Sequence, residues 1–279
     1  MPEGDTIHRA AATLQRALAG RIVTRFESVL PALTRVDVDT PIAGRTIEAV
    51  AARGKHLLMT FSPPPLAVTS SRTAARQSGG LILHTHMRMN GSWHIYRPGE
   101  RWQRPARDMR LLVATDAFVA VGFNVPVAEF VAARDVRRRA DLTSLGPDLL
   151  AETFDRADAV RRIRTRPADR IEDALLDQRL VAGIGNIFKS ETLFACGVEP
   201  TRGVADLGDE ELERIVETAR TLLTASATGG RPGWSRGRFV YGRAGKPCRR
   251  CGTPIRARKA GPDARLTYWC PRCQSRPLR

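Results

Sequence analysis

Apolar residues recur at helical spacing near the start of the chain and throughout its second half. Residues 5–19 carry one apolar stripe, formed by Ile7, Ala11, Leu14 and Leu18. This spacing predicts a helix, which Asp5 can cap at its start and Gly20 can end. The same pattern predicts further helices over residues 156–164, 170–178, 186–195 and 209–225.

Between these regions the chain has short β-like runs separated by turn residues. From Arg21 to about Val121 the runs are RIVTRF, TIEAVAARG, KHLLMTF, GLILHTHM, GSWHIY, MRLLVAT and FVAVGF. Many short strands at this spacing predict an antiparallel sandwich or barrel-like core. Three prolines followed by small polar residues predict a mobile loop over residues 62–80.

We therefore predict an α+β chain with three parts. A helix leads an antiparallel β-sandwich over residues 1–134, a helical domain covers residues 135–230, and a small cysteine-containing module covers residues 238–279. A stretch rich in Gly, Ser, Arg and Pro, residues 226–237, links the last two parts. A length of 279 residues with 42% apolar composition is sufficient for buried cores.

Composition indicates a cytosolic protein. No apolar run is long enough to cross a membrane, and the start MPEGDTIHR lacks the basic and then apolar stretch of a secretion signal. Five cysteines are too few for a disulfide-stabilised scaffold of this length. We expect no membrane partner and a monomeric protein in the cytoplasm.

The positive charge is concentrated at the C-terminal end. The formal net charge is +16, and the 51 residues from Gly229 to Arg279 hold 14 Lys and Arg but one acid, Asp263. Such an excess points to a polyanionic partner, either nucleic acid or an anionic membrane surface. A membrane-binding segment needs a basic amphipathic helix with an apolar face, which this region lacks. Nucleic acid is the better match.

Four cysteines in this basic region have metal-ligand spacing. Cys248 and Cys251 form one CxxC pair, and Cys270 and Cys273 form a second one eighteen residues later. Four thiolates in this arrangement favour one structural Zn²⁺ ion over a redox pair. The metal stabilises a segment with few aliphatic residues. Basic residues on such a module can contact phosphates: Arg249, Arg250, Arg256, Arg258, Lys259 and Arg265.

The N-terminus is a second candidate site. Removal of the initiator Met exposes Pro2 as a secondary amine. An α-amino group has a pKa near 7.7–8.0, so a fraction is unprotonated and nucleophilic at neutral pH. The neighbouring carboxyl of Glu3 can transfer protons. Many proteins begin with Met-Pro, so this signal alone is weak.

Several motifs together carry a more specific signal. In chain order they are Met1-Pro2-Glu3-Gly4, Arg53-Gly54-Lys55-His56-Leu57-Leu58, Leu145-Gly146-Pro147-Asp148, Leu175-Leu176-Asp177-Gln178, Gly183-Ile184-Gly185-Asn186, Ser190-Glu191 and Val240-Tyr241-Gly242-Arg243, which leads into the four cysteines. The chain resembles the formamidopyrimidine-DNA glycosylase and endonuclease VIII family of base-excision repair enzymes, and its endonuclease VIII branch most closely. The resemblance implies a helix–two-turns–helix element in the helical domain, a C-terminal zinc finger and damaged DNA as the partner.

The resemblance also implies roles for individual residues. Pro2 attacks C1′ of the damaged nucleotide and forms an iminium, and Glu3 is the general acid of that step. Lys55 contacts phosphate and assists the proton transfers of β-elimination. Arg265 clamps the phosphates flanking the lesion and aids δ-elimination. The implied activity is that of a bifunctional DNA glycosylase and abasic-site lyase.

Further family positions bind the DNA without doing chemistry. The resemblance implies that Asn186 binds backbone phosphate and that Met89 is the apolar wedge that fills the gap left by the flipped nucleotide. Arg88 and Asn90 fill the rest. Other interpretations are a solvated strand lysine for Lys55, a helix cap for Asn186 and a core side chain for Met89. An enzyme that acts on a base must extrude it from the stack, which a wedge and a basic clamp assist.

The chain departs from the family pattern at two places. Asp5-Thr6 stands where the family has Pro-Glu, so a second carboxyl is missing at position 6 and base excision is more doubtful than the lyase step. The loop Asp-Pro-Arg-Arg-Phe of the formamidopyrimidine branch is absent from residues 119–126. We therefore expect action on oxidised pyrimidines or abasic sites. A lyase-only or non-catalytic damage-binding protein is the alternative. His84 and His86 have no evident third metal ligand, and we interpret them as structural.

Overall fold

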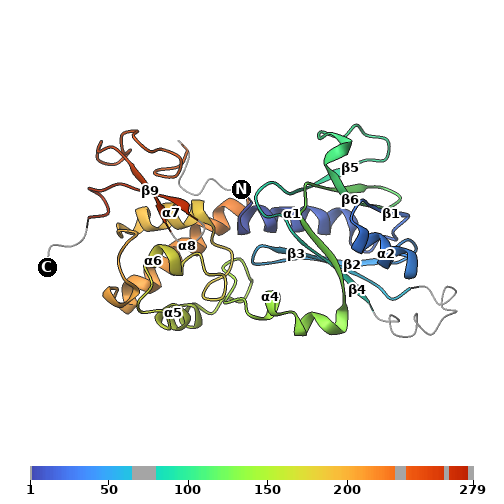
Figure 1. Cartoon of the computed structure of the whole chain (residues 1–279), viewed down its shortest axis with the longest axis horizontal. Coiled ribbons are helices and arrows are strands. Elements are labelled where there is room, and N and C mark those ends of the chain that lie inside the picture. The colour runs from blue at the N-terminus through green and yellow to red at the C-terminus, as the bar shows by residue number, and fades with distance from the viewer. Residues whose placement is uncertain (1, 65–79, 230–236, 261–263, 276–279) are drawn as a thin grey trace. The chain divides into compact units, whose positions relative to one another are not determined.

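The fold consists of two compact units. The computed structural model describes residues 2–64, 80–229, 237–260 and 264–275. The first unit comprises residues 1–2 and 6–143, and the second comprises residues 3–5 and 144–279. Strands dominate the first unit, drawn blue to green, and helices dominate the second, drawn yellow to orange (Figure 1). The domain limits given above stay a prediction.

The first unit is a sandwich of two four-stranded antiparallel sheets. One sheet has the order β1-β6-β7-β5 and the other β2-β3-β4-β8. The strands are β1 (Arg25–Ser28), β2 (Ile47–Arg53), β3 (His56–Phe61), β4 (Leu81–His86), β5 (Ser92–Tyr96), β6 (Met109–Ala114), β7 (Val119–Phe123) and β8 (Val127–Ala132). Helix α1 (Gly4–Leu18) packs its predicted apolar stripe into the core that the two sheets share. The predicted antiparallel sandwich is confirmed.

The alternation of fully buried and half-buried side chains along the strands produces this core. In β3 the side chains of Leu57, Met59 and Phe61 are fully buried, while the residues between them are half-buried. A period of two places every second side chain on the same face of a sheet. That face joins Phe26 of β1 and Leu111 of β6 in one apolar cluster.

Helix α2 (Pro31–Asp39) and strand β8 are the longest α-helix and strand of this unit that are absent from the sequence prediction. Helix α2 begins with proline, which suits the first turn of a helix, but it buries only Leu33 fully and has little periodic signal. Strand β8 follows Pro126 directly and pairs with β4. The 3₁₀ helices η2 (Ala106–Asp108) and η3 (Ala133–Arg138) and the short helix α4 (Ala140–Thr143) complete the unit.

The second unit is helical, with a small hairpin module. Its helices are α5 (Arg156–Arg164), α6 (Ile171–Ala174), α7 (Asn186–Cys196), α8 (Asp209–Ala227) and the 3₁₀ helix η4 (Val204–Asp206). Helix α7 is central, because every residue from Asn186 to Phe194 is buried. Helix α6 is shorter than predicted, and turns connect it to α7 through residues 175–185. Strands β9 (Arg256–Ala260) and β10 (Arg265–Trp269) form the antiparallel hairpin.

Two sequence predictions concern segments that the structure does not describe in full. Most of the predicted loop over residues 62–80 and of the predicted linker over residues 226–237 lies outside the described residues. Within the described part of the chain, no helix is both long and apolar enough to cross a membrane.

Candidate functional site

Pro2 lines a cavity of about 540 Å³ in the first unit. The lining residues are Pro2, Thr6, Met89, Asn90, Gly91, Arg104 and Asn124. Three of the residues singled out from the sequence therefore share one cavity: Pro2, Met89 and Asn90. Thr6, which occupies the position of the missing carboxyl, lies in the same wall. Arg104 and Asn124 carry no sequence motif, and only the fold places them there.

The loop between β4 and β5 exposes Arg88, Met89 and Asn90, whereas Met87 is buried in the core. Gly91 N donates to Met87 O at 2.9 Å and closes the loop, and a Cβ at Gly91 would lie 2.6 Å from that carbonyl oxygen. Arg88 has a φ of +48°, which is uncommon for a residue with a side chain. Met89 is 60% exposed, so the interpretation of Met89 as a core side chain is wrong.

Glu3 belongs to the second unit and is almost fully buried there. Its Oε1 accepts a hydrogen bond from Ile187 N at 2.8 Å, and its Oε2 accepts one from Phe188 N at 3.2 Å. These amides belong to the first turn of α7 and have no partner within the helix. Accepting at both oxygens suits an ionised carboxylate. Glu3 thus completes the N-terminus of α7.

The glycines of Gly183-Ile184-Gly185 make room for this carboxylate. A Cβ at Gly185 would lie 2.3 Å from Cδ of Glu3, and a Cβ at Gly4 would lie 2.7 Å from Gly183 O. Gly183 has a φ of +104°, a conformation that favours glycine. The motif therefore serves close backbone approach around Glu3.

Asp5, two residues after Glu3 in the chain, does not cap α1 as predicted. The helix already begins at Gly4, so Asp5 is its second residue. Asp5 Oδ2 accepts a hydrogen bond of 2.6 Å from Ser226 Oγ of α8. An acidic side chain in the first turn still suits the positive end of the helix dipole.

Lys55 lies in the tight turn that joins β2 to β3. Arg53 and His56 pair across this turn, and Gly54 has a φ of +58°. The half-buried Lys55 is close enough to His86 to affect it electrostatically. Burial is the main cause that lowers the pKa of His86 to about 4, and the charges of Arg88 and Lys55 add to the effect. Lys55 is not among the described residues that line the Pro2 cavity.

Two side chains of α7 hold the zinc-module hairpin. Asn186 Nδ2 donates to Leu266 O at 2.8 Å, and Lys189 Nζ donates to Thr267 Oγ1 at 2.6 Å. The cap of α7 is Gly185, so the helix-cap interpretation of Asn186 is wrong. Arg265 is the first residue of β10, directly next to this anchored segment.

A buried ion pair connects helix α6 to the same hairpin. Glu172 of α6 is fully buried and forms an ion pair with Arg258 of β9. Burial lowers the pKa of Lys189 to about 8, against the opposing effects of Glu172 and Asp173. Arg258 is therefore occupied by this contact, although the sequence suggested it as a phosphate ligand. A lone glutamate within IEDA gave no signal of this pairing.

The four predicted metal ligands come together. One sulfur atom from each of Cys248, Cys251, Cys270 and Cys273 lies within 4.8 Å of the other three. The distance is 3.9 Å between Cys248 Sγ and Cys273 Sγ, and 3.5 Å between Cys251 Sγ and Cys270 Sγ. Tetrahedral Zn–S bonds of about 2.3 Å separate the sulfurs by about 3.8 Å. The four cysteines are positioned to bind one zinc ion.

Buried polar side chains attach the cysteine module to the helices. Glu191 of α7 accepts hydrogen bonds of 2.8–3.0 Å from the backbone N–H groups of Phe239, Val240 and Tyr241. Gln274 Nε2 donates to Val198 O at 2.8 Å, and its Oε1 accepts from Cys270 N at 2.9 Å. The module is therefore a folded extension of the helical unit.

This fold combines a basic zinc-binding hairpin with a helical unit built around a buried helix, which defines a class of zinc-finger nucleic-acid-binding proteins. Residues 1–141 match the formamidopyrimidine-DNA glycosylase N-terminal domain, residues 145–235 match the H2TH domain of the same glycosylase, and residues 245–276 match a zinc finger found in FPG and IleRS. The chain belongs to the formamidopyrimidine-DNA glycosylase and endonuclease VIII family.

Individual members of this family are similar to the chain over almost its whole length. The chain is 40% identical to the "Probable endonuclease 8 2" of Streptomyces coelicolor, over 99% of this chain and 95% of that protein. It is 34% identical to the "DNA-(apurinic or apyrimidinic site) lyase Nei2" of Mycolicibacterium smegmatis, over 99% of both chains. A Lactococcus lactis formamidopyrimidine-DNA glycosylase, solved bound to DNA containing an abasic site, shares the fold with a TM-score of 0.80 at 21% identity, covering 99% of this chain and 100% of that chain.

Proposed function

We propose that this chain is a bifunctional DNA glycosylase and abasic-site lyase of base-excision repair that removes oxidised bases, pyrimidines in particular. The observation that carries the proposal is the placement of Pro2 in the wall of a cavity whose other residues include Met89 and Asn90. A nucleophile and an exposed apolar side chain in one cavity suit an extruded nucleotide and a filled gap. Relatives named as endonuclease 8 and abasic-site lyase support the same activity.

The proposed chemistry starts at the amine of Pro2. The unprotonated nitrogen attacks C1′ of the damaged nucleotide, the C1′–N bond to the base breaks, and the base leaves as an anion that takes a proton from water. Glu3 holds a carboxylate, so it takes the proton of the ammonium formed at Pro2. As the general acid it passes this proton to O4′, so that the C1′–O4′ bond breaks and the iminium forms. Lys55 assists the removal of a C2′ proton and the loss of the 3′ phosphate.

The DNA contacts of the proposal lie on both units. Asn186 and Arg265 bind phosphate beside the zinc module, and Met89 with Arg88 fills the gap left by the extruded nucleotide. The chain acts as a monomer on damaged DNA in the bacterial cytoplasm. Its domains are the catalytic β-sandwich (residues 1–134), the helix–two-turns–helix domain (residues 135–230) and the zinc finger (residues 238–279).

Covalent trapping tests the nucleophile. Borohydride reduces an iminium, so we expect an irreversible adduct between the protein and DNA that contains an abasic site. An uncleaved N-terminal extension converts the amine of Pro2 into an amide and abolishes both trapping and strand cleavage. Full trapping by the extended protein, measured as a shifted band in a denaturing gel, rules out Pro2. A C-terminal extension of equal length is the control.

A lyase without glycosylase activity is the second candidate. Thr6 lies in the cavity wall where the family has glutamate, and one relative is named as an abasic-site lyase alone. A missing carboxyl removes proton transfer to the leaving base, typically worth 10²–10⁴-fold in rate.

Thr6→Glu tests this candidate by restoring the carboxyl. We expect the variant to release an oxidised pyrimidine at least 10-fold faster than the parent, with cleavage of abasic DNA unchanged. Thr6→Gln has a similar size without the charge and is the matched control. Equal base release by the parent and both variants would show that position 6 does not limit excision.

A further inference from the structure

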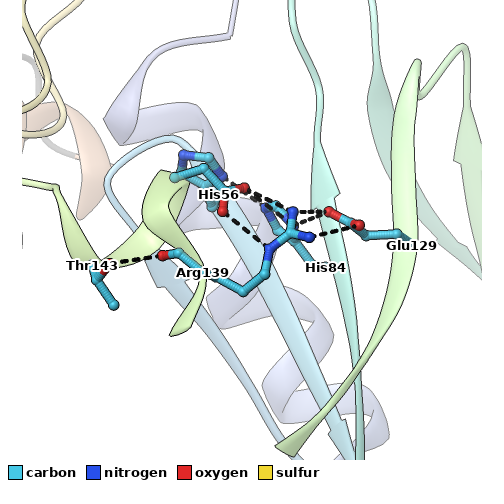
Figure 2. Close-up of polar contacts among 6 residues, drawn as sticks. His56, His84, Glu129, Arg139 and Thr143 are labelled. Carbon is cyan, nitrogen blue, oxygen red and sulfur yellow. Dashed lines mark hydrogen bonds and ion pairs between the residues drawn. The ribbon is translucent and has the colours of Figure 1, made fainter. Parts of the chain in front are cut away.

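A cluster of polar side chains lies on the β2-β3-β4-β8 sheet, immediately after Lys55. His56 begins β3, and His84 of β4 faces Glu129 of β8 in direct register. Arg139 follows η3 and Asp141 lies in α4. Figure 2 shows the Arg139 guanidinium aimed at Glu129 beside the two histidines. His84 is almost fully buried, His56 is half-buried, and the side chain of Asp141 is 39% exposed.

The hydrogen bonds define which nitrogen carries a proton. His84 Nδ1 lies 3.0 Å from Glu129 Oε1, and His84 Nε2 lies 2.7 Å from His56 Nδ1. A carboxylate only accepts, so Nδ1 of His84 carries the hydrogen and donates it to Glu129. In the neutral ring Nε2 then has a lone pair, and one proton is shared between it and His56 Nδ1.

This arrangement is the one in which histidine binds metals. A metal-binding histidine coordinates through one nitrogen while the other donates its N–H to a carboxylate or carbonyl. Here Glu129 supplies that carboxylate to His84. Replacing the shared proton by a metal ion releases the proton to solvent and needs no oxidant or reductant.

Asp141 is the candidate third ligand, and its Oδ2 lies 3.8 Å from His84 Nδ1. One ligand atom from each of His56, His84 and Asp141 lies within 4.8 Å of the other two. Tetrahedral ligand atoms around Zn²⁺ lie about 3.3–3.5 Å apart, so His56 Nδ1 and His84 Nε2, 2.7 Å apart here, separate when the ion binds between them. The exposure of Asp141 leaves a path for the ion and for a water molecule as fourth ligand.

Two carboxylates, Glu129 and Asp141, bring negative charge to the cluster. Arg139 donates to Glu129 Oε2 at 3.1 Å and to Asp141 Oδ1 at 3.1 Å, so it orients both carboxylates. Glu129 and Asp141 carry the two negative charges of the cluster, and the guanidinium of Arg139 and the nearby charge of Arg88 oppose them. Each carboxylate has about four lone-pair sites, so the bonds to Arg139 leave others for a metal ion.

We propose that His56, His84 and Asp141 bind one divalent ion of the zinc class, at a site separate from the four cysteines. Imidazole and carboxylate ligands suit this class of ion. The bound ion ties the start of β3 and the middle of β4 to α4, and thereby fixes the backbone directly after Lys55.

Metal stoichiometry tests the proposal. Full-length protein is equilibrated with Zn²⁺ in the presence of a chromophoric competitor, and bound zinc is measured by mass spectrometry. We expect two equivalents for the parent and one for His84→Gln and for Asp141→Asn. Cys270→Ser retains the histidine site while losing the cysteine site. Glu129→Gln weakens the second equivalent by about 10–100-fold, the usual effect of losing the partner of a metal-binding histidine.

Spectra and a matched control locate the ion. Co²⁺ bound by two imidazoles and a carboxylate lacks the intense thiolate bands of the cysteine site, so these two bound ions are distinguishable. His94→Gln changes a histidine of β5 outside the cluster and keeps two equivalents. One equivalent in the parent, or two in Asp141→Asn, overturns the proposal. Asp141 is partly exposed, so its substitution leaves the core and the circular dichroism unchanged.

Discussion

At the scale of single residues, Gly185 decides where Glu3 lies. The carboxylate of Glu3 reaches the first-turn amides of α7 only because position 185 has no side chain. Overpacking at such a contact forces either the backbone or the carboxylate to move. A side chain that catalyses by proton transfer must be held within hydrogen-bond distance of the atom that gives or takes the proton.

Gly185→Ala is therefore expected to impair incision. Displacement of Glu3 lowers the single-turnover cleavage rate of abasic DNA by about 10-fold or more, equivalent to ~1.4 kcal/mol of barrier. Gly208→Ala is the control, because a Cβ at Gly208 meets no atom within 4 Å. Parental incision by Gly185→Ala would show that the position of Glu3 is not required.

At the scale of elements, α7 organises the second unit. From one helix it receives the carboxylate of Glu3, holds β10 through Asn186 and Lys189, and anchors the start of the cysteine module through Glu191. Every residue of this helix from Asn186 to Phe194 is buried, so its polar side chains need partners inside the protein. Asn186, Lys189 and Glu191 therefore hold the hairpin and the cysteine module, in addition to the phosphate contact proposed for Asn186.

The buried ammonium of Lys189 makes stability depend on pH. Burial lowers its pKa from 10.5 to about 8, whereas the unfolded chain keeps the ordinary value. The unfolded state binds more protons between these values, so the free energy of unfolding rises with pH from about 8 to 10.5. One pKa unit corresponds to about 1.4 kcal/mol, so this rise is on the order of 3 kcal/mol.

Denaturant unfolding across this pH range measures the effect. Lys189→Met removes the rise, and the exposed Lys259→Met of β9 keeps it. The difference between each variant and the parent isolates this one group from the other titrating side chains. A rise of equal size in Lys189→Met would assign the pH dependence to another residue.

At the scale of the whole molecule, the charge distribution sets how the chain meets DNA. The last 51 residues carry most of the net charge of +16, on a module that buried hydrogen bonds attach to the helices. Some of these cations are held by protein partners: Arg258 pairs with Glu172, and Arg250 stacks over Phe194 at 4.5 Å. The number of phosphate contacts is therefore smaller than the charge count.

Arg265→Ala is expected to remove one such contact. Each neutralised phosphate contributes about 0.9 to the slope of log affinity against log salt, so the slope for duplex DNA falls by about that amount. Zinc content stays unchanged, because the four cysteines are intact. The exposed Arg16→Ala on α1 leaves the slope unaltered. An unaltered slope in Arg265→Ala would exclude the proposed phosphate clamp.

The sequence alone determined the fold class, the four cysteine ligands and the long helices, because each depends on short-range spacing. The tertiary structure decided which residues far apart in the chain meet. Glu3 completes a helix more than 180 residues away, Glu172 pairs with Arg258, and Asp141 lies beside His56 and His84. Helix α2 and strand β8 escaped prediction for the same reason: their stability comes from packing on distant strands rather than from their own pattern.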